Sequence, residues 1–273
     1  MKKVRRVLLI ILLLAVAATL WFVLYPTDIR NEYLLTQDMQ QAEVDGKALL
    51  EKMENAHGGY DRWAAFESGS FDQQAVWYGR NAISHWDTLP QKFHMEVRLG
   101  TEEATLKLLN GPTTGNRYRI RDGKHLSAIS GQDWQETEAT QYHEKILFKG
   151  YWFQLPFRIR EASIIRYAGQ ETFGGKTYDL LFASWGSESA NADFDQYLLY
   201  LDTESHRIAW LYFTLRDKVK GLSMSSQFTN YQAVDSLILA HSQYVRSGRP
   251  EGDGYALHEN HYENIVFGTT LTD

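Results

Sequence analysis

The feature that most constrains the fold is a long series of short segments, between residue 68 and the end of the chain, in which apolar and polar residues alternate. They recur about every 8–12 residues, which is typical of antiparallel sheets and not of parallel sheets with crossover helices. Asp122-Gly123 lies between two of them and suits the type I′ turn of a tight hairpin. The pattern therefore predicts one antiparallel sheet, curled into a barrel or half-barrel.

Few helices interrupt this pattern. Asp45 is expected to cap a helix that ends at Ala56, and a second helix is expected over 140–149, followed by the apolar block 151–157. The predicted strands cover residues 70–78, 91–99, 103–109, 117–121, 124–129, 163–170, 176–185, 195–201, 207–215, 227–233, 239–245 and 262–267.

The N-terminus has a different character. Val7 to Leu24 is a run of 18 residues without a charge, preceded by four basic residues and followed by none until Arg30. As a helix it would be ~27 Å long, close to the ~30 Å of a bilayer's hydrocarbon core. This length predicts a transmembrane anchor over 1–25. Because positively charged flanks stay in the cytoplasm, the N-terminus is expected on the cytoplasmic side. The remainder would be translocated, as a polar tether over 26–43 and a working domain over 44–273.

A cleaved signal peptide is the alternative interpretation of this segment. Ala15-Val16-Ala17 resembles a weak small-residue cleavage site. The apolar run continues past it to Leu24, and Trp21 and Tyr25 suit the membrane interface. The uncleaved anchor is therefore favoured, and it places the chain as a single-pass protein of a bacterial inner membrane with its domain in the periplasm.

Composition excludes several functions. The net charge of the chain at pH 7 is −6, and without the four basic residues before the apolar run it is −10. Nucleic acid is therefore not an expected partner. Without cysteine there is no lipid-bearing cysteine, disulfide, thiol catalysis or cysteine-zinc site. Aromatic residues make up 14% of the chain, which suits a sheet core and also the lining of a binding cavity.

No catalytic motif or cofactor-binding motif is found. In His258-Glu259-Asn260-His261 the two histidines would share a metal on a helix, but on a strand they point to opposite faces. The region is expected to be a loop entering a strand, so no metal site is predicted. His57 follows a helix and is expected to cap it rather than act as a base. We therefore predict no catalytic residue, no metal and no cofactor.

Three motifs, taken in order, resemble a known family. Ala56-His57-Gly58-Gly59 with Trp63 closes the first helix, the block 151–157 follows the second, and Tyr197 to Asp202 begins a later hairpin. Their order is similar to that of the LolA/LolB-like superfamily of bacterial envelope lipoprotein carriers, and most of all to the branch marked by AHGG…W. The resemblance covers about residues 44 to 268.

This resemblance implies an α+β fold, in which helices cover the concave face of a strongly curved antiparallel half-barrel that holds a hydrophobic ligand. His57, Gly58, Gly59 and Trp63 would form the structural motif. The candidates for the cavity lining are aromatic: Trp77, Phe93, Trp152, Phe153, Phe157, Tyr200, Trp210 and Tyr212.

The main hypothesis is a membrane-tethered, non-enzymatic periplasmic protein that binds a lipid, a lipoprotein acyl chain or another hydrophobic ligand. One departure from the carriers is that they are soluble or lipid-anchored, whereas this chain has an apparent transmembrane helix. The alternatives are an envelope sensor or scaffold that binds another protein, and an envelope hydrolase with a site near His57 or near His258 and His261.

Overall fold

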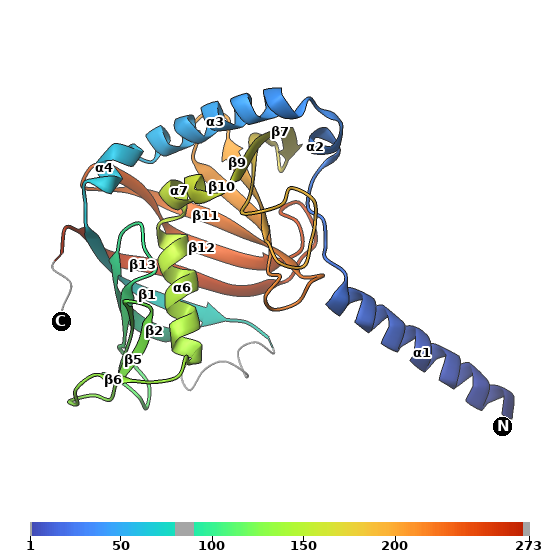
Figure 1. The fold of residues 1–273 in the computed structure, drawn as a ribbon, viewed down its shortest axis with the longest axis horizontal. Helices are drawn as coiled ribbons and strands as arrows, with labels where there is room; N and C mark the ends of the chain where they lie inside the picture. Colours follow the sequence, from blue (N-terminus) through green and yellow to red (C-terminus); the bar gives the residue numbers. More distant parts are fainter. Residues whose placement is uncertain (1, 80–89, 270–273) are drawn as a thin grey trace.

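A computed structural model describes residues 2–79 and 90–269, and these form one open antiparallel sheet (Figure 1). The sheet has 13 strands in the order β6-β5-β4-β3-β2-β1-β13-β12-β11-β10-β9-β8-β7. The strands are β1 (Ser68–Trp77), β2 (Gln91–Arg98), β3 (Ala104–Leu108), β4 (Arg117–Arg121), β5 (Lys124–Ala128), β6 (Gln135–Glu136), β7 (Ile164–Phe173), β8 (Lys176–Ser184), β9 (Gln196–Asp202), β10 (Ile208–Thr214), β11 (Ser223–Val234), β12 (Leu237–Ser247) and β13 (Ala256–Phe267).

The helices lie at the N-terminus and in the middle of the chain. They are α1 (Lys2–Leu24), α2 (Glu32–Thr36), α3 (Met39–Ala56), α4 (Tyr60–Ala64), α6 (Gln141–Phe153), α7 (Leu155–Arg158) and the 3₁₀ turn η1 (Ile159–Glu161). The predicted domain range 44–273 also includes residues 80–89 and 270–273, which lie outside the described residues.

The strands predicted from the sequence are confirmed, with differences in length. The last three strands begin earlier than expected, and the short strand β6 was not predicted. The N-terminal part of β11 contains three serines, and its apolar residues are too sparse for an alternating pattern. The neighbouring strands β10 and β12 hold it in the sheet by their hydrogen bonds.

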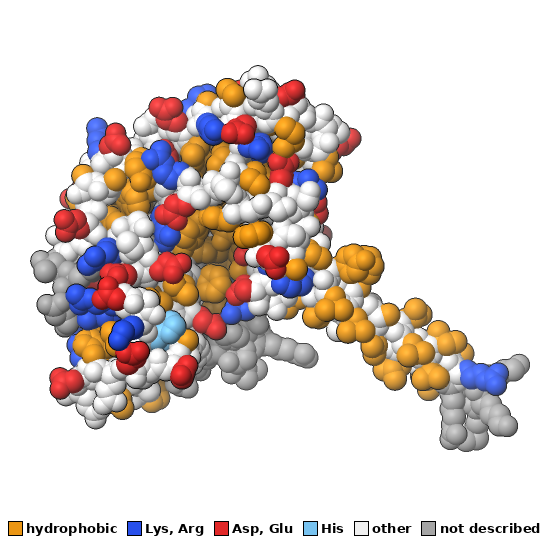
Figure 2. Space-filling view, in the orientation of Figure 1, with side chains coloured by type: hydrophobic (Ala, Val, Ile, Leu, Met, Phe, Trp, Pro, Cys, Tyr) orange, Lys and Arg blue, Asp and Glu red, His pale blue; other side chains and the backbone are white. Residues whose placement is uncertain are grey.

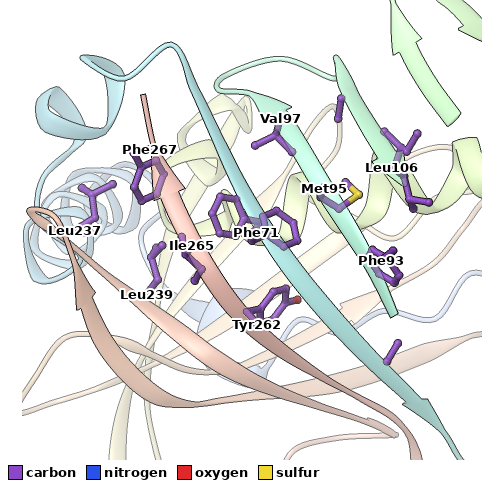
Figure 3. Packing of buried hydrophobic residues seen from close by; sticks show 14 of the residues in the cluster. Phe71, Phe93, Met95, Val97, Leu106, Leu237, Leu239, Tyr262, Ile265 and Phe267 are labelled. Atoms are coloured by element: carbon purple, nitrogen blue, oxygen red, sulfur yellow. The ribbon is translucent and has the colours of Figure 1, made fainter. Parts of the chain in front are cut away.

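Helices α3, α6 and α7 cover one face of the sheet (Figure 1). α6 packs on β2, β3 and β4, α3 packs on β7 and β8, and α7 contacts both of these helices. The cluster under α6 includes Phe71, Phe93 and Met95 from the sheet (Figure 3). Phe71 also stacks on Phe153 of α6, with 4.2 Å between the ring centroids. The predicted α+β fold is therefore confirmed as a large open antiparallel sheet with helices on one face, which is consistent with a half-barrel.

The other face of β8, β9 and β10 is covered by the segment that was predicted as a tether. Ile29 and Leu34 are each 2% exposed and pack there with Leu198 and Tyr200. The first domain helix also begins earlier than expected, because Asp38 and not Asp45 caps it by accepting hydrogen bonds from two backbone N–H groups at 2.9 Å. Residues 29–43 thus pack as part of the folded domain.

Helix α1 is present where the anchor was predicted, and it projects away from the sheet (Figure 1). The apolar side chains that the structure describes there are exposed, with Leu14 at 65%. Within the described residues, none of the helices combines the length and hydropathy needed for a membrane span. The helix is therefore confirmed, but its transmembrane role is not supported by the structure.

Candidate functional site

The histidine of the AHGG motif joins the end of α3 to the sheet. His57 is fully buried, its Nδ1–H donates to the carbonyl oxygen of Ile238 at 2.8 Å, and its Nε2 accepts from the N–H of Ile208 at 3.4 Å. Burial lowers the pKa of His57 to about 4, so the ring is neutral at pH 7. With both nitrogens bonded to backbone, His57 serves the fold and is not placed to act as a catalytic base.

The rest of the motif is structural as well. Gly58 has a φ of +110°, and a Cβ there would collide with the carbonyl oxygen of Ser236. Trp63 stacks on Phe157 with 5.3 Å between the ring centroids. The motif therefore allows the chain to turn tightly between α3 and α4 against the β11–β12 hairpin.

The structure separates the eight aromatic residues that were predicted to line one interior. Phe93, Phe153 and Phe157 are buried in the cluster under α6, with Trp77 half-buried at its margin. Trp152 is half-buried beside the second cluster, under α3 and α7. These five lie on the helix-covered face, and their role in ligand binding stays a prediction.

Tyr200, Trp210 and Tyr212 lie on the opposite face of the sheet. Tyr200 alternates with Leu199 and Leu201, which face the helices, so a strand period of two residues turns Tyr200 outward. This corrects the expectation that all eight share one interior. The apolar character of β9 and β10 on both faces concealed which positions point inward.

A hollow opens in the helix-covered face, beside α6 and over strands β10 to β12 (Figures 1 and 2). Figure 2 shows hydrophobic side chains at its floor. Trp152 of α6 contacts Phe213 edge-on, with 4.8 Å between the ring centroids, and its centroid lies 6.4 Å from that of Phe228. Trp152 of α6 and Met224 and Phe228 of β11 are only partly buried, so apolar surface remains accessible on these elements.

A polar cluster adjoins this apolar surface. Asn260 of β13 accepts hydrogen bonds from Gln73 at 2.5 Å and from the ammonium of Lys149 at 2.7 Å. The Asn260 amide donates to Gln243 Oε1 at 2.8 Å, and the hydroxyl of Tyr262 donates to the same oxygen at 3.1 Å. Gln243 is paired across the strands with Phe228, so the cluster borders the hollow.

The cluster has unused hydrogen-bonding groups. Gln243 Nε2 and Gln73 Oε1 of the cluster, and the hydroxyl of Ser226 on the adjacent strand β11, are buried and have no hydrogen-bond partner among the described residues. Among the residues that the structure describes, no carboxylate lies within ion-pair distance of Lys149. Burial lowers the pKa of Lys149 to about 7. Such groups are costly to bury unless something bonds to them.

Sequence reasoning missed this cluster because its members come from α6 and three strands that are distant in the chain. A signal was present, since Gln73, Gln243 and Asn260 occupy strand positions that alternate with outward residues and so point at the core. Polar residues at inward positions are unusual in a sheet core.

The two histidines of the His258–His261 segment lie on opposite faces of β13. His258 is paired with Trp77 and Val245, whereas His261 is paired with Gln74 and Ser242. The segment lies within β13 and is not the loop that was expected, and the two side chains point to opposite faces as predicted for a strand. The described residues contain no group of three or more His, Asp or Glu side chains that could hold a metal ion.

Two grooves elsewhere have several charged side chains in their lining. One of about 880 Å³ follows the ends of β1 to β4, where Arg98 pairs with Glu103 at 3.2 Å. The other, of about 650 Å³, lies along α3 and α4, where Arg160 pairs with Glu54 at 2.9 Å. Their opposite charges neutralise each other, so neither is suited to an apolar chain.

The fold is LolA-like by comparison with solved structures. It is similar to a LolA superfamily protein from Nitrosomonas europaea, with a TM-score of 0.54 and 11% identity over 83% of this chain and 94% of that one. It is also similar to a protein described as an outer membrane lipoprotein-sorting domain from Vibrio parahaemolyticus, with a TM-score of 0.53 and 12% identity. That match covers 85% of this chain and 95% of the other. A third similar structure is a DUF1329 family protein from Desulfovibrio piger, with a TM-score of 0.53 and 10% identity. That match covers 84% of this chain and 95% of the other. No protein-family model and no curated protein sequence matches the chain.

Proposed function

We propose that this protein is a non-enzymatic binding protein for a lipid, a lipoprotein acyl chain or another hydrophobic ligand. The observation that carries the proposal is the hollow on the helix-covered face, where Trp152, Met224 and Phe228 keep apolar surface partly exposed. Removing such surface from water contributes about 25 cal/mol per Å². A ligand can therefore be held reversibly without covalent chemistry.

The fold and the engagement of His57 by the backbone support a binding role. A structure described as a lipoprotein-sorting domain has the same fold. The histidine of the AHGG motif, His57, is fully buried and bonded through both nitrogens. A hydrolase site at that position would first have to expose this ring.

Lipid extraction of the purified full chain, followed by mass spectrometry, tests whether a hydrophobic ligand copurifies. Titration with a fluorescent hexadecanoyl probe then tests the place of binding. Trp152→Ala removes roughly 60 Å² of apolar contact, so the affinity should fall about tenfold.

Trp134→Ala is the matched control, because its ring lies against Arg117 and Arg119, which point to the face away from the helices. It should leave the affinity unchanged. The proposal is wrong if no lipid copurifies and the probe does not bind, or if both variants bind the probe as the wild type does.

We also propose that helix α1 attaches the chain to the bacterial inner membrane with the domain in the periplasm. The support is the sequence: an uncharged run from Val7 to Leu24 preceded by four basic residues. Alkaline extraction of membranes should leave the chain in the pellet, and its intact mass should include residues 1–25. A mass that corresponds to a chain starting after Ala17 would show that the segment is cleaved, and it would contradict the attachment.

A further inference from the structure

We propose that the cluster around Lys149 binds the anionic head group of the ligand, so that the ligand is a long-chain amphiphile with an anionic oxygen head, such as a fatty carboxylate. This inference rests on the proposed function and names the chemical class of its ligand. The apolar chain would lie against Trp152 and Phe228, and the head would meet the ammonium of Lys149.

The placement of Lys149 on α6 links the two parts of this site. Lys149 and Trp152 are three residues apart, so they lie on the same face of the helix. The Lys149 ammonium lies 5.7 Å from the ring centroid of Phe93 and 2.7 Å from Asn260 Oδ1. The cation is thus set between an apolar wall and the polar cluster.

Lys149 differs from the next two arginines in the chain, of which Arg158 is buried and Arg160 is exposed. Arg158 pairs with Glu161 at 2.8 Å, and Arg160 pairs with Glu54 at 2.9 Å. Within the described residues, Lys149 has only a neutral amide as its polar partner. A half-buried ammonium without a counter-ion is unfavourable, and an anionic ligand would supply the missing charge.

Buried neutral donors accompany the ammonium. Gln243 is 2% exposed and its Nε2 has no partner, and Ser226, which is fully buried, has a free hydroxyl. Ser226 is paired with Leu211 and Val245, so it faces the same side of the sheet as the helices. Anionic oxygens accept several hydrogen bonds at once, and these groups together with Lys149 provide them.

The electrostatic state of Lys149 agrees with this role. Burial lowers the pKa of Lys149 to about 7, so the amine is only partly protonated at neutral pH in the free protein. A carboxylate bound beside it would favour the charged form and raise that pKa again. The binding of an anion thus restores the charge that burial disfavours.

The test compares two ligands of equal chain length, hexadecanoate and hexadecan-1-ol, by competition against a fluorescent acyl probe on the full chain. The wild type should bind hexadecanoate at least tenfold more tightly than hexadecan-1-ol. Lys149→Met should abolish this preference by weakening hexadecanoate alone, and Lys149→Arg should keep most of it.

Lys107→Met is the matched control, because Lys107 is an exposed lysine on β3 whose neighbours Leu106 and Leu108 face the core. It should not change either affinity. Thermal unfolding of each variant shows whether the fold persists, and the preference of the wild type can be measured without any variant.

The outcomes separate the two proposals. If both ligands bind with equal affinity, or if Lys149→Met keeps the preference, the head-group site is refuted while hydrophobic binding stands. If neither ligand binds, the proposed function itself fails. A preference that Lys107→Met abolishes would place the anion outside the hollow and would also refute the head-group site.

Discussion

His57 and Lys149 are two basic side chains inside the same domain, and burial lowers the pKa of both. His57 has both nitrogens bonded to backbone and is surrounded by the rings of Phe157 and Tyr231. Lys149 is half-buried beside a hollow, and the amide cluster that it joins has two atoms, Gln243 Nε2 and Gln73 Oε1, that lack partners among the described residues. The first site is closed and complete, whereas the second has unused bonding capacity.

This difference separates groups that maintain the fold from groups that are available to a ligand. A buried polar group with all its bonds satisfied rigidifies the structure around it. Buried polar groups with unmet bonds reduce stability, and they persist where a function requires them. The pKa shift alone would not have distinguished His57 from Lys149, because its cause is the same in both.

The largest effect should come from the glycine next to His57. Gly58→Ala forces a Cβ against the carbonyl oxygen of Ser236 at a φ of +110°, which should lower the free energy of unfolding by about 4 kcal/mol. Gly123→Ala is the control, because Gly123 has a φ of +71° but no atom within 4 Å of the added Cβ. It should cost about 1 kcal/mol. Urea unfolding measures both variants. If Gly58→Ala and Gly123→Ala lose the same free energy of unfolding, the contact with the β11–β12 hairpin does not contribute to the effect at Gly58.

The second effect is the pH dependence of stability from His57. Its pKa is about 4 in the folded state and about 6.5 when unfolded, so the unfolded state binds the proton more readily. The contribution is fully present above pH 6.5 and is lost as the pH falls towards 4, by roughly 3 kcal/mol in total. Urea unfolding between pH 7.5 and 4 measures this loss.

His57→Gln is the control for that measurement, since glutamine does not titrate. The variant should be less stable than the wild type at pH 7.5, and the difference between the two should shrink as the pH falls. A difference that stays constant with pH would mean that His57 is protonated, or solvated, in the folded protein.

The smallest effect on stability is expected at Lys149. Lys149→Met removes a half-buried ammonium and one hydrogen bond to Asn260 and leaves a side chain of similar length. These changes oppose each other, so the free energy of unfolding should stay within about 1 kcal/mol of the wild type. A loss above about 3 kcal/mol would show that Lys149 maintains the fold as His57 does, and the contrast between them would disappear.

Much of the fold could be predicted because its signals are local. The Asp122-Gly123 turn and the period of two in the strands depend on neighbouring residues, and the hairpins follow from them. The segment 26–43 was predicted as a tether because its apolar residues are few. Ile29 and Leu34 are nevertheless buried, since β8 to β10 present an apolar outer face that no short window of sequence reveals.

The sequence by itself determined the antiparallel sheet, the helix at the N-terminus and the turn at the end of α3, because each depends on short-range backbone preferences. Only the tertiary structure decided which aromatic residues share a face and which polar residues meet. Lys149 and Asn260 are 111 positions apart, and they touch because α6 lies across the sheet. The site that we propose exists only through that packing.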